Sequence, residues 1–395
     1  MRGTLERHTW VFDGTGDVSP KFRRSCRYES FTPWLLAGFD LRLPADIAAG
    51  VAEAEAAIVR LDARADPALD PLARLLLRTE AIASSRIEDM QVEVRALARA
   101  EAKYDLGGSI GSEALEILRS VEAMQLAVDS VEAAPTITSE LIRELHAALM
   151  QSAPPWTKAG EYRTAQNWIG GNNFNPCGAA FVPPPPDAVG PLMADLCEFA
   201  SSELVSPIVQ AAVAHAQFET IHPFNDGNGR TGRALIHAIL GRRGVARQFV
   251  TPVSVVLGQR RDRYIEGLTA FRADELESWI EHFAFAAAKA ARLSSEYLDS
   301  VSALRESWRA ELAASRRAPR ADSVAWKLIE VLPSQLVLTG SAAVSATGGA
   351  KPRVNQAIEL LVECGILRPV TSGARNRAWE PIGLIDIVEE LERGQ

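Results

Sequence analysis

The sequence predicts a mainly α-helical protein with a β-hairpin near its middle and a helix-turn-helix with two short strands near its end. Apolar residues recur three and four positions apart over most of the 395 residues, which is the period of an amphipathic helix. Two stretches rich in Gly, Asn and Pro interrupt this pattern, at 160–186 and at 338–383. A hydrophobic fraction of 47% with 23% charged residues indicates a globular chain with a sizeable core.

Net charge and cysteine content indicate which ligands and which cellular compartment to expect. The net charge of -8 and pI near 5.5 argue against broad adhesion to nucleic acid or anionic membranes, so such a contact would need a local basic patch. The cysteines lie far apart without a CxxC pair, which fits neither a disulfide framework nor a thiolate zinc site: Cys26, Cys177, Cys197 and Cys364. We therefore expect a reducing, cytoplasmic setting, and no membrane contact because no apolar run resembles a signal peptide or a membrane span.

The first clear helix follows Asp70 and Pro71, which together are typical of a helix start. Its apolar face continues at helical spacing through Leu72, Leu75, Leu76, Thr79 and Ile82. This face is interpreted as core rather than as a functional surface.

Two further helices lead to the centre of the chain. One is capped by Thr138 or Ser139, and the single histidine on it, His146, is interpreted as structural. The other spans 207–221 and is rich in alanine, which allows close packing, so we expect it to be central. Between them, Tyr162–Ile169 and Ala179–Val182 read as the arms of a hairpin with a free edge. On loop signals alone, an irregular surface loop is the favoured alternative.

The C-terminal segment predicts a winged helix-turn-helix. A short helix, a glycine turn, a helix over Pro352–Cys364 and two strands around a turn at Gly373 follow one another, after a connecting helix that Pro319 ends. A local basic set could contact phosphate backbones, with a protein-binding or packing module as an equal alternative; its members are Lys351, Arg353, Arg368, Arg375 and Arg377.

The stretch 222–233, "HPFNDGNGRTGR", is where chemistry is concentrated. Pro223 is expected to hold His222 in an extended backbone, so that the preceding helix ends there. Glycines let successive N–H groups converge at the start of the next helix, which makes an anion cradle. Arg230 and Arg233 would oppose the helix dipole unless a polyphosphate lay between them. A glycine turn alone is usually only a turn, but that interpretation explains only the glycines.

Two side chains of this stretch are candidates for catalysis. Asp226 would repel a bare phosphate, so its presence is explained if it holds Mg²⁺ that bridges phosphate oxygens. The helix dipole disfavours an imidazolium at His222, which leaves a neutral ring that can act as a general base. The alternative to these catalytic roles is that the two residues form only a weak metal-binding pair without a third ligand.

The stretch is similar in full to the signature of the Fic (filamentation induced by cAMP) family. The resemblance implies transfer of AMP from ATP to a protein hydroxyl, with His222 as the base and Asp226 as the magnesium ligand. It implies that Phe224 anchors the loop and that the phosphate-binding residues are Gly227, Asn228, Gly229, Arg230 and Arg233. The related Doc branch has lysine in place of Gly229 and phosphorylates, so the glycine favours AMP transfer.

Two further segments resemble parts of this family. Residues 160–171 with 181–186 look like its flap, along whose edge a target strand would lie, which assigns target binding to Tyr162, Arg163, Trp168, Ile169 and Gly170. The segment "SSRIED" looks like its inhibitory motif, with Ser84 and Glu88 as the inhibitory residues. Glu88 would then occupy the γ-phosphate position beside Arg233. The motif normally has Gly or Asn where this chain has Asp89.

The sequence therefore predicts an N-terminal helical region over 1–110 that carries the inhibitory helix, and a Fic catalytic core over 111–295. A connecting helix over 296–320 and a winged helix-turn-helix over 321–395 complete the expected order. The leading function is an autoinhibited protein adenylyltransferase that acts on Tyr, Thr or Ser of a target and on itself. The alternatives are a DNA-binding regulator whose core mainly self-modifies or senses nucleotide, and AMP removal by the same site. A homodimer, the target and the nucleobase pocket are left open.

Overall fold

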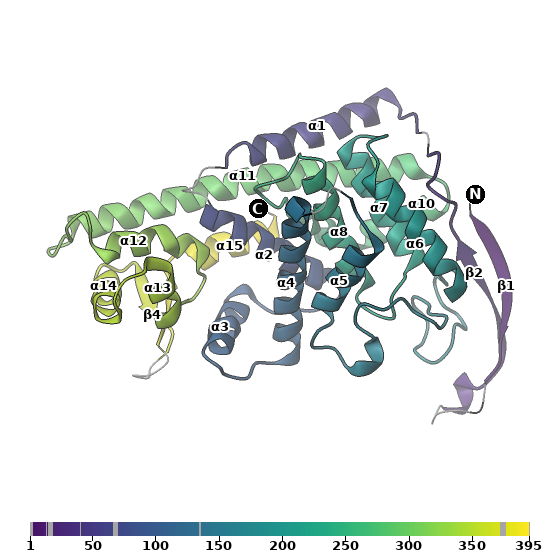
Figure 1. Ribbon diagram of the computed structural model, residues 1–395, viewed down its shortest axis with the longest axis horizontal. Helices are drawn as coiled ribbons and strands as arrows, with labels where there is room; N and C mark the ends of the chain where they lie inside the picture. Colours follow the sequence, from purple (N-terminus) through teal and green to yellow (C-terminus); the bar gives the residue numbers. More distant parts are fainter. Residues whose placement is uncertain are drawn as a thin grey trace. The chain divides into compact units, whose positions relative to one another are not determined.

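The computed structural model describes residues 3–12, 14, 19–39, 41–65, 70–133, 136–371 and 377–394 (Figure 1). The chain forms two compact units. The first comprises Met1–Glu55, Glu122–Val245 and Arg260–Phe285, and the second comprises Ala56–Val121, Ala246–Gln259 and Ala286–Gln395. Each unit is thus assembled from three separate stretches, whereas the expected domains followed one another along the chain.

The predicted mainly helical fold is confirmed. The elements of the first unit are β1 (Thr4–Trp10), η1 (Pro20–Phe22), β2 (Cys26–Thr32), α5 (Ser139–Leu149), η2 (Pro155–Thr157), α6 (Pro186–Ser201), α7 (Pro207–Ile221), α8 (Asn228–Arg242) and α10 (Arg261–Arg272). Three helices run through the borders between the units, namely α1 (Ala45–Asp62), α4 (Ser112–Ala133) and α11 (Leu276–Ala314).

Helix α7 is the centre of the first unit, as its alanine-rich sequence predicts. Every residue of α7 is buried, and α6, α8 and α10 pack on it (Figure 1). Trp279 at the start of α11 donates its indole N–H to the carbonyl oxygen of Ala212, at 2.8 Å. Small side chains let these helices approach closely, so α7 and α8 hold the connecting turn between them in a fixed frame.

An N-terminal hairpin was missed by the helical prediction for residues 1–110. Strands β1 and β2 pair antiparallel, from Thr4 opposite Thr32 to Trp10 opposite Cys26. Cross-strand pairs stabilise it, because the Arg7 guanidinium donates to Glu29 at 2.9 Å and His8 stacks on Tyr28. The alternation of side chains over 4–10 was the available signal, but it is short and mixed in polarity.

The disulfide expectation is wrong. Cys26 on β2 and Cys177 are bonded, with their Cα atoms 5.9 Å apart, although 151 residues separate them in sequence. Spacing along the chain cannot reveal such a pair, because only the fold brings the two residues together. Cys197 and Cys364 are free, the former buried and the latter half-buried.

The predicted central hairpin is reduced to one contact. Ile169 and Phe181 form a single antiparallel bridge, in which each backbone N–H donates to the other's carbonyl oxygen, at 2.8 and 3.2 Å. The arms expected at 162–169 and 179–182 are otherwise irregular. Positive φ angles at Gly170 and Gly171 turn the chain out of the ladder immediately after the bridge.

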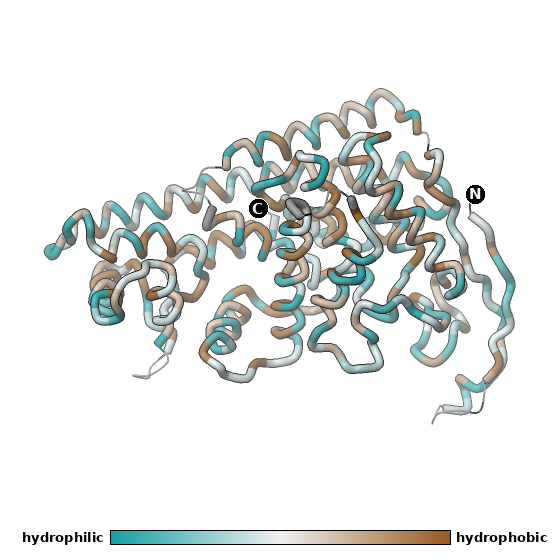
Figure 2. Tube along the Cα trace, in the orientation of Figure 1, coloured by the Kyte–Doolittle hydropathy of each residue, from teal (hydrophilic) through white to brown (hydrophobic). Residues whose placement is uncertain are grey.

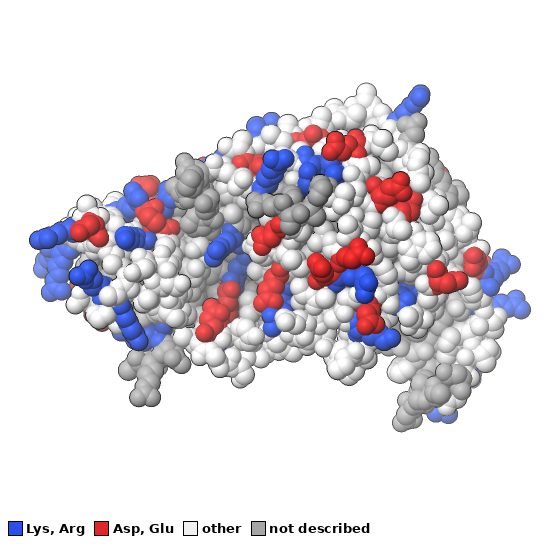
Figure 3. Space-filling model, viewed as in Figure 1, with Lys and Arg blue, Asp and Glu red and all other residues white. Residues whose placement is uncertain are grey.

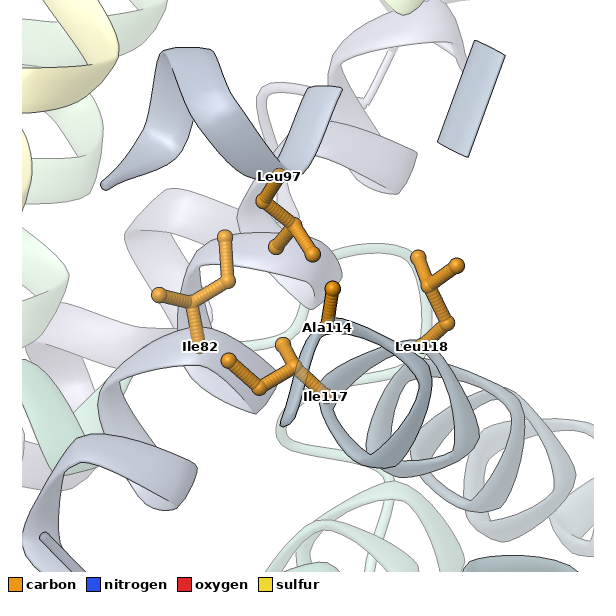
Figure 4. Close-up of a cluster of buried hydrophobic side chains, with 5 residues drawn as sticks. All are labelled: Ile82, Leu97, Ala114, Ile117 and Leu118. Atoms are coloured by element: carbon orange, nitrogen blue, oxygen red, sulfur yellow. The ribbon is translucent and has the colours of Figure 1, made fainter. Parts of the chain in front are cut away.

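The second unit contains the remaining elements. They are α2 (Asp70–Ile87), α3 (Val94–Asp105), α9 (Val253–Gln259), α12 (Val324–Val331), η3 (Leu332–Ser334), β3 (Leu338–Thr339), α13 (Gly340–Thr347), α14 (Lys351–Glu363), β4 (Leu367–Pro369), β5 (Ala378–Pro381) and α15 (Leu384–Arg393). Figure 4 shows where α2, α3 and α4 meet, in a cluster of Ile82, Leu97, Ala114, Ile117 and Leu118. The alternation of hydrophobic and hydrophilic residues that drives this packing can be followed along the helices in Figure 2.

The C-terminal elements follow the order predicted for a winged helix-turn-helix, with α13 and α14 before β4 and β5. An additional strand, β3, extends the sheet to the order β3-β5-β4, and α15 follows it. The assignment as a DNA-binding winged helix stays a prediction. Arg375 and Gly373 lie outside the described residues.

Two members of the expected basic set contact the protein itself. The Arg368 guanidinium pairs with Glu380 on β5, which is buried. The Arg377 guanidinium lies over the Trp379 ring and 3.8 Å from the Glu359 carboxylate. On the face in Figure 3, acidic and basic side chains are interspersed, and basic ones gather near the α11–α12 connection. These pairings reduce the charge that Arg368 and Arg377 can offer to a ligand.

Among the helices that the structure describes, none is both long enough and apolar enough to cross a membrane.

Removing the Leu97 side chain should destabilise the second unit. Leu97 is fully buried, so Leu97→Ala is expected to cost about 2–5 kcal/mol, because it leaves a cavity in the cluster of Figure 4. Val59→Ala on the exposed face of α1 is the control and should change stability by no more than about 0.5 kcal/mol. Thermal unfolding of both variants checks this, and equal melting temperatures would contradict the packing.

Candidate functional site

The turn from α7 to α8 carries the motif residues. His222 ends α7 with φ 50° and ψ 60°, a left-handed backbone. The expected extended backbone at this residue is therefore wrong. Pro223 disfavours the right-handed helical conformation at His222, and His222 adopts the left-handed conformation instead of the extended one. The carbonyl oxygen of His222 accepts hydrogen bonds from Arg163 Nε at 2.9 Å and from Asn167 Nδ2 at 3.3 Å. These two donors hold an unusual conformation at the predicted base.

Phe224 anchors the turn in the core, as expected for this position. It is completely buried, and its ring stacks on that of His146 with centroids 3.7 Å apart and planes within 4°. Asn228 closes the turn, because its amide accepts from the Phe224 N–H and donates to the Phe224 carbonyl oxygen, both at 2.9 Å. Asn228 therefore shapes the loop through its side chain, in addition to any phosphate contact through its backbone.

His146 is a positioning residue that the sequence analysis interpreted only as structural. Its Nδ1 accepts the Gly160 N–H at 2.9 Å, so the proton is on Nε2, which lies 3.0 Å from the Asp226 carbonyl oxygen and donates to it. Burial lowers the pKa of His146 to about 4. The ring is neutral at pH 7 and supports the turn through stacking and two hydrogen bonds.

Two glycines of the motif have different physical roles. Gly227 caps α8 with φ 73°, and a Cβ there would lie 2.8 Å from Met150 Sδ and 3.2 Å from Leu149. Gly232 has an ordinary helical backbone, but a Cβ on it would approach Glu219 and Phe218 of α7 to 2.9 Å. Gly227 thus permits the turn, and Gly232 permits the close packing of α7 and α8.

The start of α8 is suited to binding an anion. The N–H groups of Asn228, Gly229 and Arg230 form its first turn, where the helix dipole is positive. Arg230 and Arg233 are 5% and 1% exposed, one turn apart on the same helix. Guanidinium groups recognise phosphate oxygens in a bidentate manner, so two of them at a helix start suit a polyphosphate ligand.

Asp226 fits the role of a single magnesium ligand. Its side chain is exposed, and its Oδ1 accepts the Gly227 N–H at 2.6 Å, which orients the carboxylate at the mouth of the cradle. Among the described residues, no group of three or more His, Cys, Asp or Glu could hold a metal by itself. Mg²⁺ usually binds through one or two protein carboxylates together with substrate phosphates, so a single oriented carboxylate fits this ion.

Some of the predicted flap residues have side chains buried in the protein, and the others are at least partly exposed to solvent. Arg163 is 2% exposed, and its guanidinium donates to the carbonyl oxygens of Pro184 at 2.6 Å and His222 at 2.9 Å. Burial lowers its pKa to about 10, which leaves it charged. Its expected contact with a target is therefore replaced by a positioning role, since a buried guanidinium cannot reach one.

Tyr162 also points inward. Its hydroxyl lies 2.8 Å from Ser139 Oγ, its ring packs on Phe224, and burial raises its pKa to about 12. Asn167, for which the local sequence gives no signal, links the flap to the motif by donating to the carbonyl oxygen of Phe224 at 3.0 Å. Trp168, Ile169 and Gly170 are partly or fully exposed and stay the candidates for target contact.

The predicted inhibitory motif ends α2 with a well-defined cap. The Met90 N–H donates to the Ser85 carbonyl oxygen at 3.3 Å and the Asp89 N–H to the Arg86 carbonyl oxygen at 3.1 Å, which is the Schellman pattern. Asp89 has φ 65°. The departure at Asp89 is thereby explained, because Gly, Asn and Asp are the residues that tolerate this left-handed position.

Glu88 is exposed at this cap, while Ile87 and Ser84 are buried, as their helical spacing predicts. A carboxylate at the negative end of a helix is unfavourable for the helix dipole. Arg86 is held by Glu392 of α15, with nitrogen and oxygen 2.7 Å apart. Glu88 belongs to the second unit and Arg233 to the first, and the predicted pairing between them stays a prediction.

Two parts of the chain match known families. Residues 136–240 match the Fic/DOC family, and residues 49–129 match the Fic/DOC family N-terminal region. The protein adenylyltransferase Fic of Drosophila erecta is 30% identical over 187 residues, which are 47% of this chain and 34% of that relative. That of Nematostella vectensis is 30% identical over 188 residues, 47% of this chain and 40% of the relative. This chain thus matches about a third of the length of its curated relatives, and the resemblance read from the motif is confirmed.

Solved structures show the same fold. A Fic family protein from Desulfovibrio desulfuricans G20 has a TM-score of 0.53 and 22% identity, and the match covers 87% of this chain and 98% of that one. A Fic domain-containing signaling protein from Bacteroides thetaiotaomicron has a TM-score of 0.52 and 17% identity, with 64% and 97% covered. At these identities the likeness concerns the fold alone.

The pH dependence of stability should carry the signature of His146. An unfolded histidine titrates near pH 6.5 and the folded one near 4. The unfolded state therefore binds a proton that the folded state does not, and stability falls by about 3 kcal/mol as pH drops from 6.5 to 4. His146→Gln can keep both hydrogen bonds without titrating. Its unfolding free energy, measured across this range, should fall less than that of the wild type; parallel pH profiles would contradict the assignment.

Proposed function

From the Fic/DOC match over residues 136–240, we propose that this protein is a protein adenylyltransferase, which transfers AMP from ATP to a hydroxyl of a target protein and of itself. The observation that carries the proposal is the α7–α8 turn, where His222 precedes a glycine-capped helix start with two buried arginines. The relatives named protein adenylyltransferase support the same chemistry.

In the proposed step, His222 accepts the proton of the target hydroxyl. The hydroxyl oxygen attacks the α-phosphorus of ATP, the bond from that phosphorus to the bridging oxygen breaks, and pyrophosphate leaves. His222 Nδ1 lies 3.8 Å from Glu219 Oε2.

The phosphate cradle does the remaining work of positioning and charge stabilisation. The first N–H groups of α8 and the Arg230 guanidinium bind phosphate oxygens, and Arg233 binds the γ-phosphate. Asp226 would hold Mg²⁺, which neutralises charge on the phosphates when it is bound. In this assignment, Gly229 leaves room for the α-phosphate close to the helix backbone.

Target binding is assigned to the exposed part of the flap. Trp168 precedes the residue that bridges to Phe181, so its backbone N–H and C=O groups point away from that pair. A target segment added along this edge would be held by main-chain hydrogen bonds, which position a Tyr, Thr or Ser hydroxyl with little sequence demand.

We assign control of the enzyme to Glu88. Its carboxylate stands at the end of a capped helix where the local dipole does not favour it, and the resemblance of this segment to the family's inhibitory motif supports the assignment. A carboxylate in the γ-phosphate position would misplace the α-phosphate, and a displacement of about 1 Å costs on the order of a hundredfold in rate.

His222→Ala should abolish AMP transfer and leave ATP binding nearly unchanged, because the cradle consists of backbone and arginine while proton removal needs the imidazole. Labelling with ATP, mass spectrometry of the modified residue and an ATP-binding isotherm on the same sample test this. His282→Ala on α11 is the control and should retain transfer. Undiminished transfer by His222→Ala would remove the base assignment, and labelling confined to the chain itself would favour the regulatory alternative.

Glu88→Gly should raise labelling by roughly a hundredfold at unchanged fold. Asp89→Asn is the matched control, since it keeps a residue that tolerates the left-handed cap and leaves the carboxylate in place; its labelling should equal that of the wild type. Arg233→Ala combined with Glu88→Gly should be inactive, because the γ-phosphate still needs the arginine. Equal labelling by wild type and Glu88→Gly would place control of the enzyme elsewhere. Loss of AMP from a premodified protein in the wild type alone would favour AMP removal.

A further inference from the structure

The N-terminal hairpin is joined to both ends of the segment 177–182. At one end, the Cys26–Cys177 disulfide joins β2 to residues 172–180, which connect the two parts of the flap; the name flap covers 160–186 from here on. At the other end, the Phe31 N–H donates to the Val182 carbonyl oxygen at 2.9 Å. Residues 26–31 and 177–182 therefore run in the same direction and are joined at both ends.

Additional contacts stand close to the disulfide. The Asn175 side chain donates to the Phe22 carbonyl oxygen at 2.8 Å, and the rings of Phe22 and Phe174 stack with centroids 4.8 Å apart. Asn175 is 2% exposed, so its hydrogen bond is protected from water. This end of the hairpin is thus a built contact rather than a chance approach of two loops.

Between the two joined ends, the walls separate around a cavity of about 580 Å³. Tyr28 and Glu29 line it from the hairpin, and Ala180 and Phe181 line it from the flap. Continuous strand pairing cannot hold the walls together across this space. The disulfide and the contacts beside it therefore restrain the end of this segment that contains Cys177.

The arms of the flap share one backbone bridge, and the side chains of Asn172 and Asn175 order the turn between them. One antiparallel bridge, between Ile169 and Phe181, orders its two arms, and Gly170, Gly171 and Gly178 have positive φ angles. Holding the edge of a glycine-rich segment in one position costs conformational entropy. An external restraint is what would keep its edge ready for a target strand.

We propose that the hairpin β1–β2 braces the flap for target binding, and that Cys26–Cys177 is the positioning bond, which thiol reductants open. The proposal rests on the proposed function for its consequence, but the brace is a property of the fold. On reduction, a dithiol supplies two electrons and two protons, Cys26 and Cys177 become thiols, and the dithiol becomes its cyclic disulfide. In a reducing compartment, such a bond would form only under oxidising stress, so it would couple target capture to redox state.

The test is hydrogen exchange of the full-length protein, purified without reductant, before and after treatment with dithiothreitol. Peptides covering 168–182 should exchange at least about tenfold faster after reduction, while peptides from α7 and α8 should not change. Mass spectrometry after alkylation should show Cys26 and Cys177 bonded before treatment and free after it. Reoxidation should restore the slow exchange.

Cysteine variants distinguish a disulfide that restrains the flap from one that stabilises the whole unit. Cys26→Ser combined with Cys177→Ser should exchange like the reduced protein and ignore dithiothreitol, whereas Cys364→Ser should respond like the wild type. ATP binding should be the same in all three, and self-labelling should fall only where the flap is loosened. These exchange data need no AMP transfer, so the proposal can fail independently of the proposed function.

Two outcomes would overturn the brace. Free thiols at both positions in the untreated protein, or equal exchange over 168–182 in the oxidised and reduced states, would show that the bond does not restrain the flap. Faster exchange of α7 and α8 on reduction would show instead that the bond stabilises the whole unit.

Discussion

The stacking of His146 on Phe224 is the contact on which the rest of the candidate site depends. It joins a buried ring of α5 to the turn between α7 and α8, at a centroid distance of 3.7 Å. The same histidine is hydrogen-bonded on both ring nitrogens, to the backbone of Gly160 and Asp226. A neutral ring can do this without the cost of burying a charge. The backbone of the turn is therefore fixed by contacts within the protein itself.

A second set of contacts secures the side of the turn that faces the flap. Arg163 is buried and reaches carbonyl oxygens of both the flap base and the end of α7, and Asn167 reaches the carbonyl oxygen of Phe224. Such hydrogen bonds from a charged donor are strong because the surroundings exclude water. They offset the left-handed backbone of His222, which would otherwise relax. The flap and the motif are thus one hydrogen-bonded assembly.

The second unit has its own organising feature, the cap of α2. Two backbone hydrogen bonds end the helix at Ile87 and leave Glu88 at the cap and Asp89 in the left-handed position. Around it, Arg86 pairs with the buried Glu392 of α15, and Arg95 of α3 pairs with the buried Glu380 of β5. Each pair compensates a buried carboxylate. The proposed inhibitory segment is therefore held by the C-terminal elements of the same unit.

The sequence by itself determined the helical class and the buried, central place of the alanine-rich helix α7, because both depend on local periodicity and side-chain size. Only the tertiary structure decided which distant residues support the site. The local sequence around His146 does not distinguish it from any other buried helix residue. The sequence around Arg163 would be the same whether its side chain were buried or exposed on a strand. Cys26 and Cys177 are 151 residues apart, and no local pattern records a contact at that separation. Such contacts arise when elements pack, so their energy depends on the whole fold and not on any one segment.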